Sequence, residues 1–278
     1  MIETFSDFAQ FKRKAAELDV NVNLDELQEI DVVFLESYGN YVILAIKTTG
    51  GKKNDILVLG EKNSLLYSEK TFGEKDYRIF KHTLQKQYGE STVLTLLTLR
   101  STLEDYSGAF KILDETIDSL EAEYRPGLAE ETTTKLRRLT NRVEDFATLM
   151  MSLEERKIVQ VNANLVTYDY GITTAKAQHL LDRCRNHLHQ LRDIQRQAEM
   201  KESHEMNRNI AELASAAKKL AAISAILLVP VIIAGHFGFN FNYLTGLGAM
   251  PSAFPTLLVA EIALTALAAW YLKKMRWF

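Results

Sequence analysis

LAAISAILLVPVIIAGHF, the sequence from Leu220 to Phe237, contains no Asp, Glu, Lys or Arg. Its 18 residues come close to the roughly 20 helical residues that span the hydrocarbon core of a membrane. The stretch without charged residues continues to Ala260, 41 residues in all, whereas the first 219 residues carry 30 basic and 35 acidic side chains. A charged part is therefore joined to an apolar part, and the apolar part predicts a membrane protein.

A second apolar stretch, Phe254 to Leu272, contains one charged residue, Glu261. Two spans place both termini on the same side of a membrane, and the loop between the spans has no Lys or Arg. Positively charged residues flank the spans at the other ends: Lys218, Lys219, Lys273, Lys274 and Arg276. By the positive-inside rule, we expect contact with lipid in the inner (plasma) membrane and both termini in the cytoplasm. The alternative is a buried helical hairpin of a soluble protein.

The first part of the chain alternates short strand-like runs with turn residues. The runs are rich in Val, Ile, Leu and Tyr and cover residues 31–36, 41–48, 56–59 and 64–68. They predict a small sheet of three or four strands, with covering helices over 5–18 and 74–88. Apolar residues at helical spacing then predict an αα hairpin of helices 93–123 and 128–161. The predicted fold class is α+β for this cytoplasmic part.

A third helical pattern starts near Thr173 and continues without Pro or Gly as far as Pro230. A helix from Thr174 to Phe237 would be about 95 Å long, which no globular core needs. We therefore expect a very long stalk helix that continues into a two-span transmembrane helical domain, with a coiled-coil anchor without a pore as the alternative. The predicted domains are an α/β cytoplasmic domain (1–92), a helical hairpin (93–172), the stalk (173–219), the first transmembrane helix (220–240), an outer loop (241–253), the second transmembrane helix (254–272) and a basic tail (273–278).

The composition excludes several functional classes. The net charge is −3 and no strongly basic block precedes the tail, so nucleic acid is not an expected partner. Cys184 is the only cysteine, which excludes an intramolecular disulfide and any multi-cysteine metal site. The sequence has no nucleophile–base pair, phosphate-binding loop or dinucleotide fingerprint, so we expect neither an enzyme nor a cofactor.

The order of these parts resembles the CorA-type divalent-cation transporter superfamily over nearly the whole chain. The family's Gly-Met-Asn signature follows the first span, and Gly238-Phe239-Asn240 occupies that place in this chain. The Gly-X-Asn form also occurs in the zinc-transporting ZntB-like branch. The resemblance implies a homo-oligomer, a pentamer, in which the first span lines a pore for divalent cations. Mg²⁺ is the expected substrate, with Co²⁺ and Ni²⁺ as further candidates.

The resemblance also implies roles for individual residues. One face of the first span would line the pore: Leu220, Ser224, Leu228, Val231 and Gly235. These positions fall within about 80° of helix rotation, so one face can hold them, although the same stripe could pack helix on helix. Asn240 would contact the hydrated ion through its amide oxygen, which suits Mg²⁺ because this ion loses its water reluctantly.

Three residues within or beside the spans have their own alternatives. Glu261 is an ionisable group inside a span and is a candidate for proton coupling or metal contact, as is His236. A neutral, hydrogen-bonded Glu261 and an interfacial His236 are the alternatives. Pro230 leaves the Ile226 carbonyl without its helical partner and should kink the span, either as a hinge or exposed pore oxygen or as a tolerated kink with no role.

In the resembling family, divalent ions bound between cytoplasmic subunits hold the channel closed. Acidic residues are frequent in the predicted hairpin: Asp114, Glu115, Asp118, Glu121, Glu123, Glu130 and Glu131. No bridging pair can be assigned among them, and a solvated helix face is the alternative. The histidines at 179, 187, 189 and 204 do not form a metal motif. Three functions follow: a divalent-cation channel, a proton-coupled zinc or transition-metal transporter of the same fold, and a non-conducting membrane scaffold.

Overall fold

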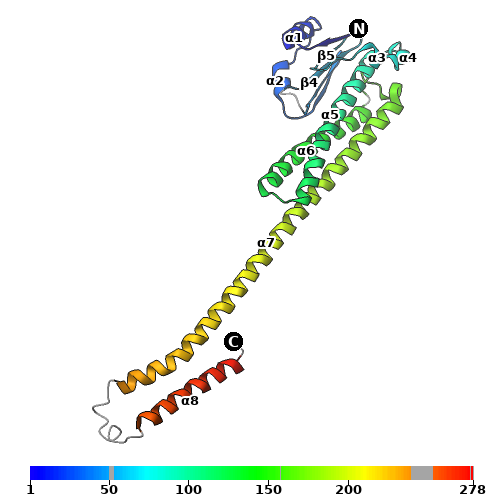
Figure 1. Cartoon of the computed structure of the whole chain (residues 1–278). Helices are drawn as coiled ribbons and strands as arrows, with labels where there is room; N and C mark the ends of the chain where they lie inside the picture. The colour runs from blue at the N-terminus through cyan, green and yellow to red at the C-terminus, as the bar shows by residue number, and fades with distance from the viewer. Residues whose placement is uncertain (50–52, 157, 239–252, 276, 278) are drawn as a thin grey trace. The chain divides into compact units, whose positions relative to one another are not determined.

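Figure 1 presents the computed structural model, which describes residues 1–49, 53–156, 158–238, 253–275 and 277. The chain divides into two units, Met1–Ala198 and Glu199–Phe278. The first unit contains the sheet and a helical bundle. The second contains the end of the longest helix together with the last helix.

The sheet has five strands in the order β1-β5-β4-β3-β2. These are β1 (Ile2–Phe5), β2 (Phe34–Tyr38), β3 (Tyr41–Ile46), β4 (Asp55–Gly60) and β5 (Ser64–Tyr67). Strands β2 to β5 form an antiparallel meander, and β1 pairs in parallel with β5. The four predicted strands are confirmed with shifted ends. The prediction missed β1, because its four residues give little local signal and its partner lies some sixty positions later.

Both faces of the sheet are covered. Side chains alternate along β3, so that Val42, Leu44 and Ile46 pack toward α5 (Gly89–Ala122), whereas Ile43 and Ala45 pack toward α1 (Phe8–Glu17) and α2 (Leu24–Glu29). A sheet buried on both faces needs the near-continuous apolar runs that the sequence contains. The helix predicted over 5–18 starts later, because the Asp7 side chain accepts a hydrogen bond from the Ala9 N–H and caps α1.

The single helix predicted over 74–88 is wrong. The segment instead forms two short helices, α3 (Glu74–Arg78) and α4 (Lys81–Leu84), and Tyr88 adopts a left-handed conformation with φ 60°. Helix α5 then begins at Gly89, where an added Cβ would lie 1.8 Å from the Thr83 carbonyl oxygen. This close approach explains why the chain turns at a glycine.

The helical bundle of the first unit consists of α5, α6 (Pro126–Glu155) and the beginning of α7 (Thr167–Gly238), which Figure 1 shows side by side. The rings of Tyr106 and Phe146 meet edge to face in its core, 5.7 Å apart. The second predicted helix ends six residues early, and a 3-10 turn, η1 (Ala163–Val166), leads into α7. Helix α7 starts before Gly171 because Tyr170 is buried and donates a hydrogen bond to the Met150 carbonyl, which outweighs the helical cost of glycine.

Helix α7 has 72 residues and passes through Pro230 without interruption to Gly238. Among the described residues, one helical stretch, Ala163–Ile233, is long and apolar enough to cross a membrane, and its most apolar window has a mean hydropathy of 2.0. Helix α8 (Ala253–Lys274) has 22 residues and occupies the second predicted span. The second crossing of the membrane and the pentamer stay predictions.

Candidate functional site

The packing within the second unit divides the end of α7 into two faces. One face carries buried or half-buried side chains: Ala222, Ile226, Val229, Pro230 and Ile233. The five residues predicted to line the pore are all exposed: Leu220, Ser224, Leu228, Val231 and Gly235. At the rotation of an α-helix, the centres of the two sets lie roughly 180° apart. The predicted pore face is therefore the face of α7 that this unit leaves uncovered.

Glu261 faces α7 across a cavity of about 490 Å³. Pro230 lines this cavity from α7, and residues three and four positions apart line it from α8: Leu258, Glu261, Ile262, Thr265, Ala266 and Ala269. The Thr265 hydroxyl donates to the Glu261 backbone carbonyl at 2.8 Å, so it is engaged with the backbone. Glu261 is the only charged residue among these lining residues. Its position on the α7-facing side of α8 could not be read from the sequence.

The outer end of α7 bears the predicted signature. The helix ends at Gly238, while Phe239, Asn240 and most of the predicted outer loop lie outside the described residues. The side chain of His236 lies outside them as well. Within the described part of the chain, no group of three His, Cys, Asp or Glu side chains could hold a metal ion. The ion-contacting role of Asn240 therefore stays a prediction.

Basic and aromatic side chains pair just before the apolar stretch of α7 and at the end of α8. The ammonium of Lys218 lies 5.7 Å from the centre of the Trp277 ring, and that of Lys274 lies 5.3 Å from the Trp270 ring. The first pair joins α7 to the segment that follows α8. Trp, Lys and Arg residues that flank apolar helical stretches are typical of a membrane–water interface on the positively charged side.

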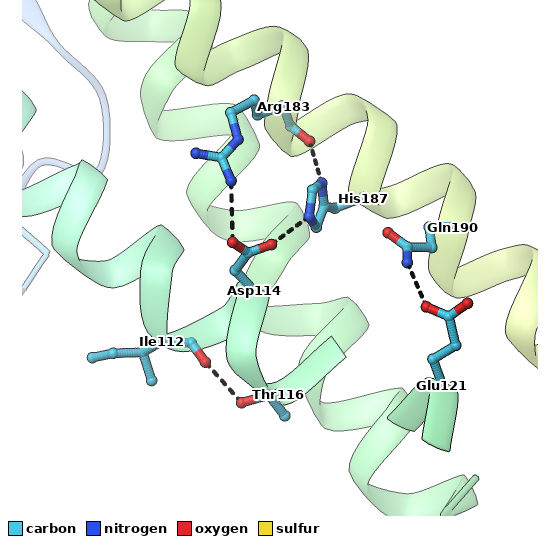
Figure 2. Close-up of polar contacts among 7 residues, drawn as sticks. All are labelled: Ile112, Asp114, Thr116, Glu121, Arg183, His187 and Gln190. Carbon is cyan, nitrogen blue, oxygen red and sulfur yellow. Dashed lines mark hydrogen bonds and ion pairs between the residues drawn. The ribbon is translucent and has the colours of Figure 1, made fainter. Parts of the chain in front are cut away.

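In the first unit, Asp114 on α5 binds two side chains of α7 (Figure 2). His187 Nε2 lies 2.5 Å from one carboxylate oxygen, and an Arg183 guanidinium N–H donates to the other at 3.1 Å. The guanidinium also lies 4.5 Å from the centre of the Phe110 ring. Sequence reasoning missed this cluster, because its members are about seventy positions apart. The four-residue spacing of Arg183 and His187 on one helix face was its only local signal.

A second acid named for metal regulation also binds a side chain of α7. The Gln190 side-chain amide donates to Glu121 at 3.0 Å, about two helical turns beyond Asp114 (Figure 2). Asp114 and Glu121 therefore connect α5 to α7 within one chain. Glu115 and Asp118 are exposed on the same helix and stay available to ligands from outside.

Asp55 is a further ionisable group at the start of β4. Burial raises the pKa of its carboxyl to about 6, against the lowering effects of a hydrogen bond from Ser68 and the charge of Lys70. The Lys70 ammonium itself binds Asp105 at 2.5 Å and Ser101 at 3.1 Å. The first unit therefore contains a carboxyl that changes charge near neutral pH.

A family model described as CorA-like Mg²⁺ transporter protein matches residues 50–274, which include both apolar helices. The chain belongs to this CorA-like family. The family is one of divalent-cation transporters. A comparison with curated protein sequences finds no significant match.

Solved structures of the CorA-like fold agree with this assignment. The CorA magnesium transporter from Methanocaldococcus jannaschii is 15% identical, with a TM-score of 0.60 over 99% of this chain and 90% of that chain. The full-length CmaX protein is 14% identical, with a TM-score of 0.54 over 96% of this chain and 86% of that one. The cytoplasmic domain of ZntB from Vibrio parahaemolyticus is 9% identical, with a TM-score of 0.52 over 69% and 84%. At these identities, the likeness shows a shared fold.

Proposed function

We propose that the protein is an oligomeric membrane channel that moves divalent cations, Mg²⁺ first, across the cytoplasmic membrane. The observation that carries the proposal is the uncovered face of α7 with its five predicted pore residues. Two helices of one chain cannot enclose a pore, so several copies must contribute this face. We infer a pentamer, as the family resemblance implies, with divalent cations as its substrate.

The chemistry of the predicted pathway suits a hydrated cation. A ring of Asn240 amide oxygens would contact the water shell of Mg²⁺ without removing it. The carbonyl end of α7 points toward the same mouth and adds partial negative charge. Deeper in the pore, rings of Leu228 and Val231 would close the pathway by excluding water, with Ser224 supplying a hydroxyl.

Gating is the role that we propose for the first unit. Helix α7 starts in the bundle beside α5 and continues as the pore helix, so a change in bundle packing has a covalent route to the pore. Divalent cations that bridge exposed carboxylates such as Glu115 and Asp118 would stabilise one packing over another. Cations would thus be both substrate and regulator.

Flux into proteoliposomes tests the proposal. Purified protein is tested with Mg²⁺, Co²⁺, Ni²⁺ and Zn²⁺, with and without a pH gradient, beside Asn240→Ala. We expect Mg²⁺ entry that ignores the gradient and is lost in Asn240→Ala. If a correctly assembled oligomer shows no flux of any of these ions, the result would favour the non-conducting scaffold.

Cysteine accessibility tests the pore face directly. In a Cys184→Ala background, single cysteines replace Ser224 or Gly235, the two positions of the uncovered face outside the apolar rings, and Val229 on the α8-facing side is the matched control. A charged, water-soluble thiol reagent should modify the first two at least about tenfold faster, because thiolates react only where water reaches them. Equal rates at the three positions would contradict the assigned pore face.

A second function is favoured by one observation, the cavity that places Glu261 against α7. A carboxyl at that depth is suited to accept and release a proton, as a proton-coupled zinc or transition-metal transporter requires. Zn²⁺ flux that follows the pH gradient, with Mg²⁺ flux absent, would establish this function instead of the channel.

A further inference from the structure

The cavity between α7 and α8 isolates Glu261 from other charges. Its remaining lining is apolar apart from Thr265, whose hydroxyl is bonded to the backbone. On α8 the next titratable residue is Tyr271, about 15 Å along the helix, followed by Lys273. On α7, Lys219 is more than three turns from Pro230, and the side chain of His236 lies outside the described residues. An ionised carboxylate in this cavity would have no described counter-ion.

Pro230 leaves a backbone carbonyl of α7 in need of a hydrogen-bond donor. Proline has no N–H, so the carbonyl of Ile226 lacks the hydrogen bond that an α-helix normally gives it. In a helix this carbonyl points toward residue 230 and thus lies on the same face, where Ile226 itself is half-buried. A buried carbonyl without a donor is costly in a membrane. The Ile226 carbonyl, one helical turn before Pro230, therefore needs a donor from outside the backbone of α7, and a carboxyl is a donor only when it is protonated.

We propose that Glu261 is a proton-binding site whose protonated carboxyl donates a hydrogen bond to the Ile226 carbonyl and so fixes the geometry of α7 at Pro230. When the proton leaves, the bond is lost and the helix is free to change its bend. Leu228 and Val231 lie within two residues of Pro230 on the uncovered face, so the bend sets the width of the predicted pore. The effect on flux rests on the proposed channel function, whereas the proton site does not.

Infrared spectroscopy in lipid tests the proton site without transport, on the full-length protein with Asp55→Asn throughout, because the buried Asp55 carboxyl would give a similar band of its own. The C=O stretching band of a protonated carboxylic acid in an apolar setting should disappear at high pH. It should be absent in Glu261→Gln and shifted in Pro230→Ala, because alanine restores an N–H to the Ile226 carbonyl and displaces the acid. Thr265→Val, which changes a lining residue bonded only to the backbone, should leave the band unchanged. A band that survives in Glu261→Gln, or that Pro230→Ala does not shift, would overturn the proposal.

Flux at equal pH on both sides tests the regulation. In the wild type, a symmetric pH change should alter Mg²⁺ flux about 2- to 10-fold, the change in population that one net hydrogen bond supports. Glu261→Gln keeps a donor and should hold the flux at the wild-type acid level at every pH, and Pro230→Ala should also be insensitive to pH. Both variants must assemble like the wild type in size-exclusion chromatography. A pH response that persists in either variant would overturn the regulatory role. Infrared bands as expected with no flux in the wild type would instead reject the channel function and retain the proton site.

Discussion

The two units of the chain differ in how completely they bury their apolar side chains. In the first unit the large apolar side chains cover one another, and residues such as Leu44, Leu99 and Phe146 have no exposed surface. Among the described residues of both units, the only buried side-chain polar atom without a hydrogen-bond partner is Asn54 Oδ1. In the second unit apolar side chains remain exposed, as for Leu220 (67%) and Val259 (65%). The first unit completes its own core, whereas the second leaves apolar surface that suits contact with lipid.

The difference shows that the rule which places apolar side chains inside a water-soluble core does not apply to the whole chain. The strands and bundle helices of the first unit follow the rule for water, with apolar faces turned inward. The end of α7 buries only the face that carries Ala222 and Pro230, and it leaves apolar residues outside. Such a surface is stable only in a solvent as apolar as itself, so the units should respond differently to the same substitution.

Cavity formation should give the largest contrast. Phe146→Ala removes a fully buried ring that contacts Tyr106 edge to face, and it should lower the free energy of unfolding of the first unit by about 3–5 kcal/mol. Leu228→Ala in the second unit should change that value by less than about 0.5 kcal/mol. Urea unfolding of the full-length protein in detergent, followed by amide exchange in α6, measures both. An equal loss of unfolding free energy in the two variants would contradict the independence of the two units.

A pH-dependent effect of intermediate size should arise at Asp55. Its folded-state pKa of about 6 lies above the ordinary 3.8, so the folded protein holds this proton more tightly than the unfolded chain does. Stability from this group is therefore greatest at low pH and is lost as the pH rises through about 6. Asp55→Asn keeps the shape without the charge and should stabilise the first unit by about 1–3 kcal/mol at pH 8. At pH 4 it should have little effect.

Amide exchange in β3 and β4, corrected for the intrinsic pH dependence of exchange, follows this change in the full-length protein. An equal effect at pH 4 and pH 8 would mean that burial of the Asp55 charge is not its cause.

The smallest effect should come from the contacts between α5 and α7. Asp114→Ala leaves Arg183 and the half-buried His187 without their shared partner, and it should cost about 1–2 kcal/mol. Glu144→Ala breaks the Arg185–Glu144 pair, whose side chains are 49% and 51% exposed, and should cost less than about 0.5 kcal/mol. Urea midpoints of the two variants make the comparison. Identical midpoints would show that the Asp114 cluster is no stronger than a surface ion pair.

The features predicted from the sequence are those that local pattern determines. The apolar helical stretch Leu220–Phe237 was predicted from its lack of charged residues alone. The strands 41–46 and 64–67 were predicted from short apolar runs between turn residues. The start of α7 was misplaced because the buried contact of Tyr170 overrides the weak helical propensity of Gly171. Tertiary context, which no local window contains, decided that boundary.

The candidate site was predictable to a similar degree. The stripe from Leu220 to Gly235 was assigned through helical spacing and the family resemblance, but only the structure revealed that α8 covers the opposite face. Glu261 was recognised as unusual from sequence, whereas its place across a cavity from Pro230 depends on how two helices meet. The cluster at Asp114 depends on residues far apart in the chain, and short-range patterns carry no signal for it.

The parallel pairing of β1 with β5 has a consequence for the order of events on the ribosome. Ile2 is made first, yet its partner Ser64 follows some sixty codons later, a delay of about 3–12 seconds at ordinary rates of synthesis. Strands β2 to β4 can meanwhile pair with one another, because they lie next to each other in the sequence. Strand β1 therefore stays unpaired throughout this interval and joins the sheet only after β5 has been made, and until then its backbone is open to pairing with a neighbouring nascent chain.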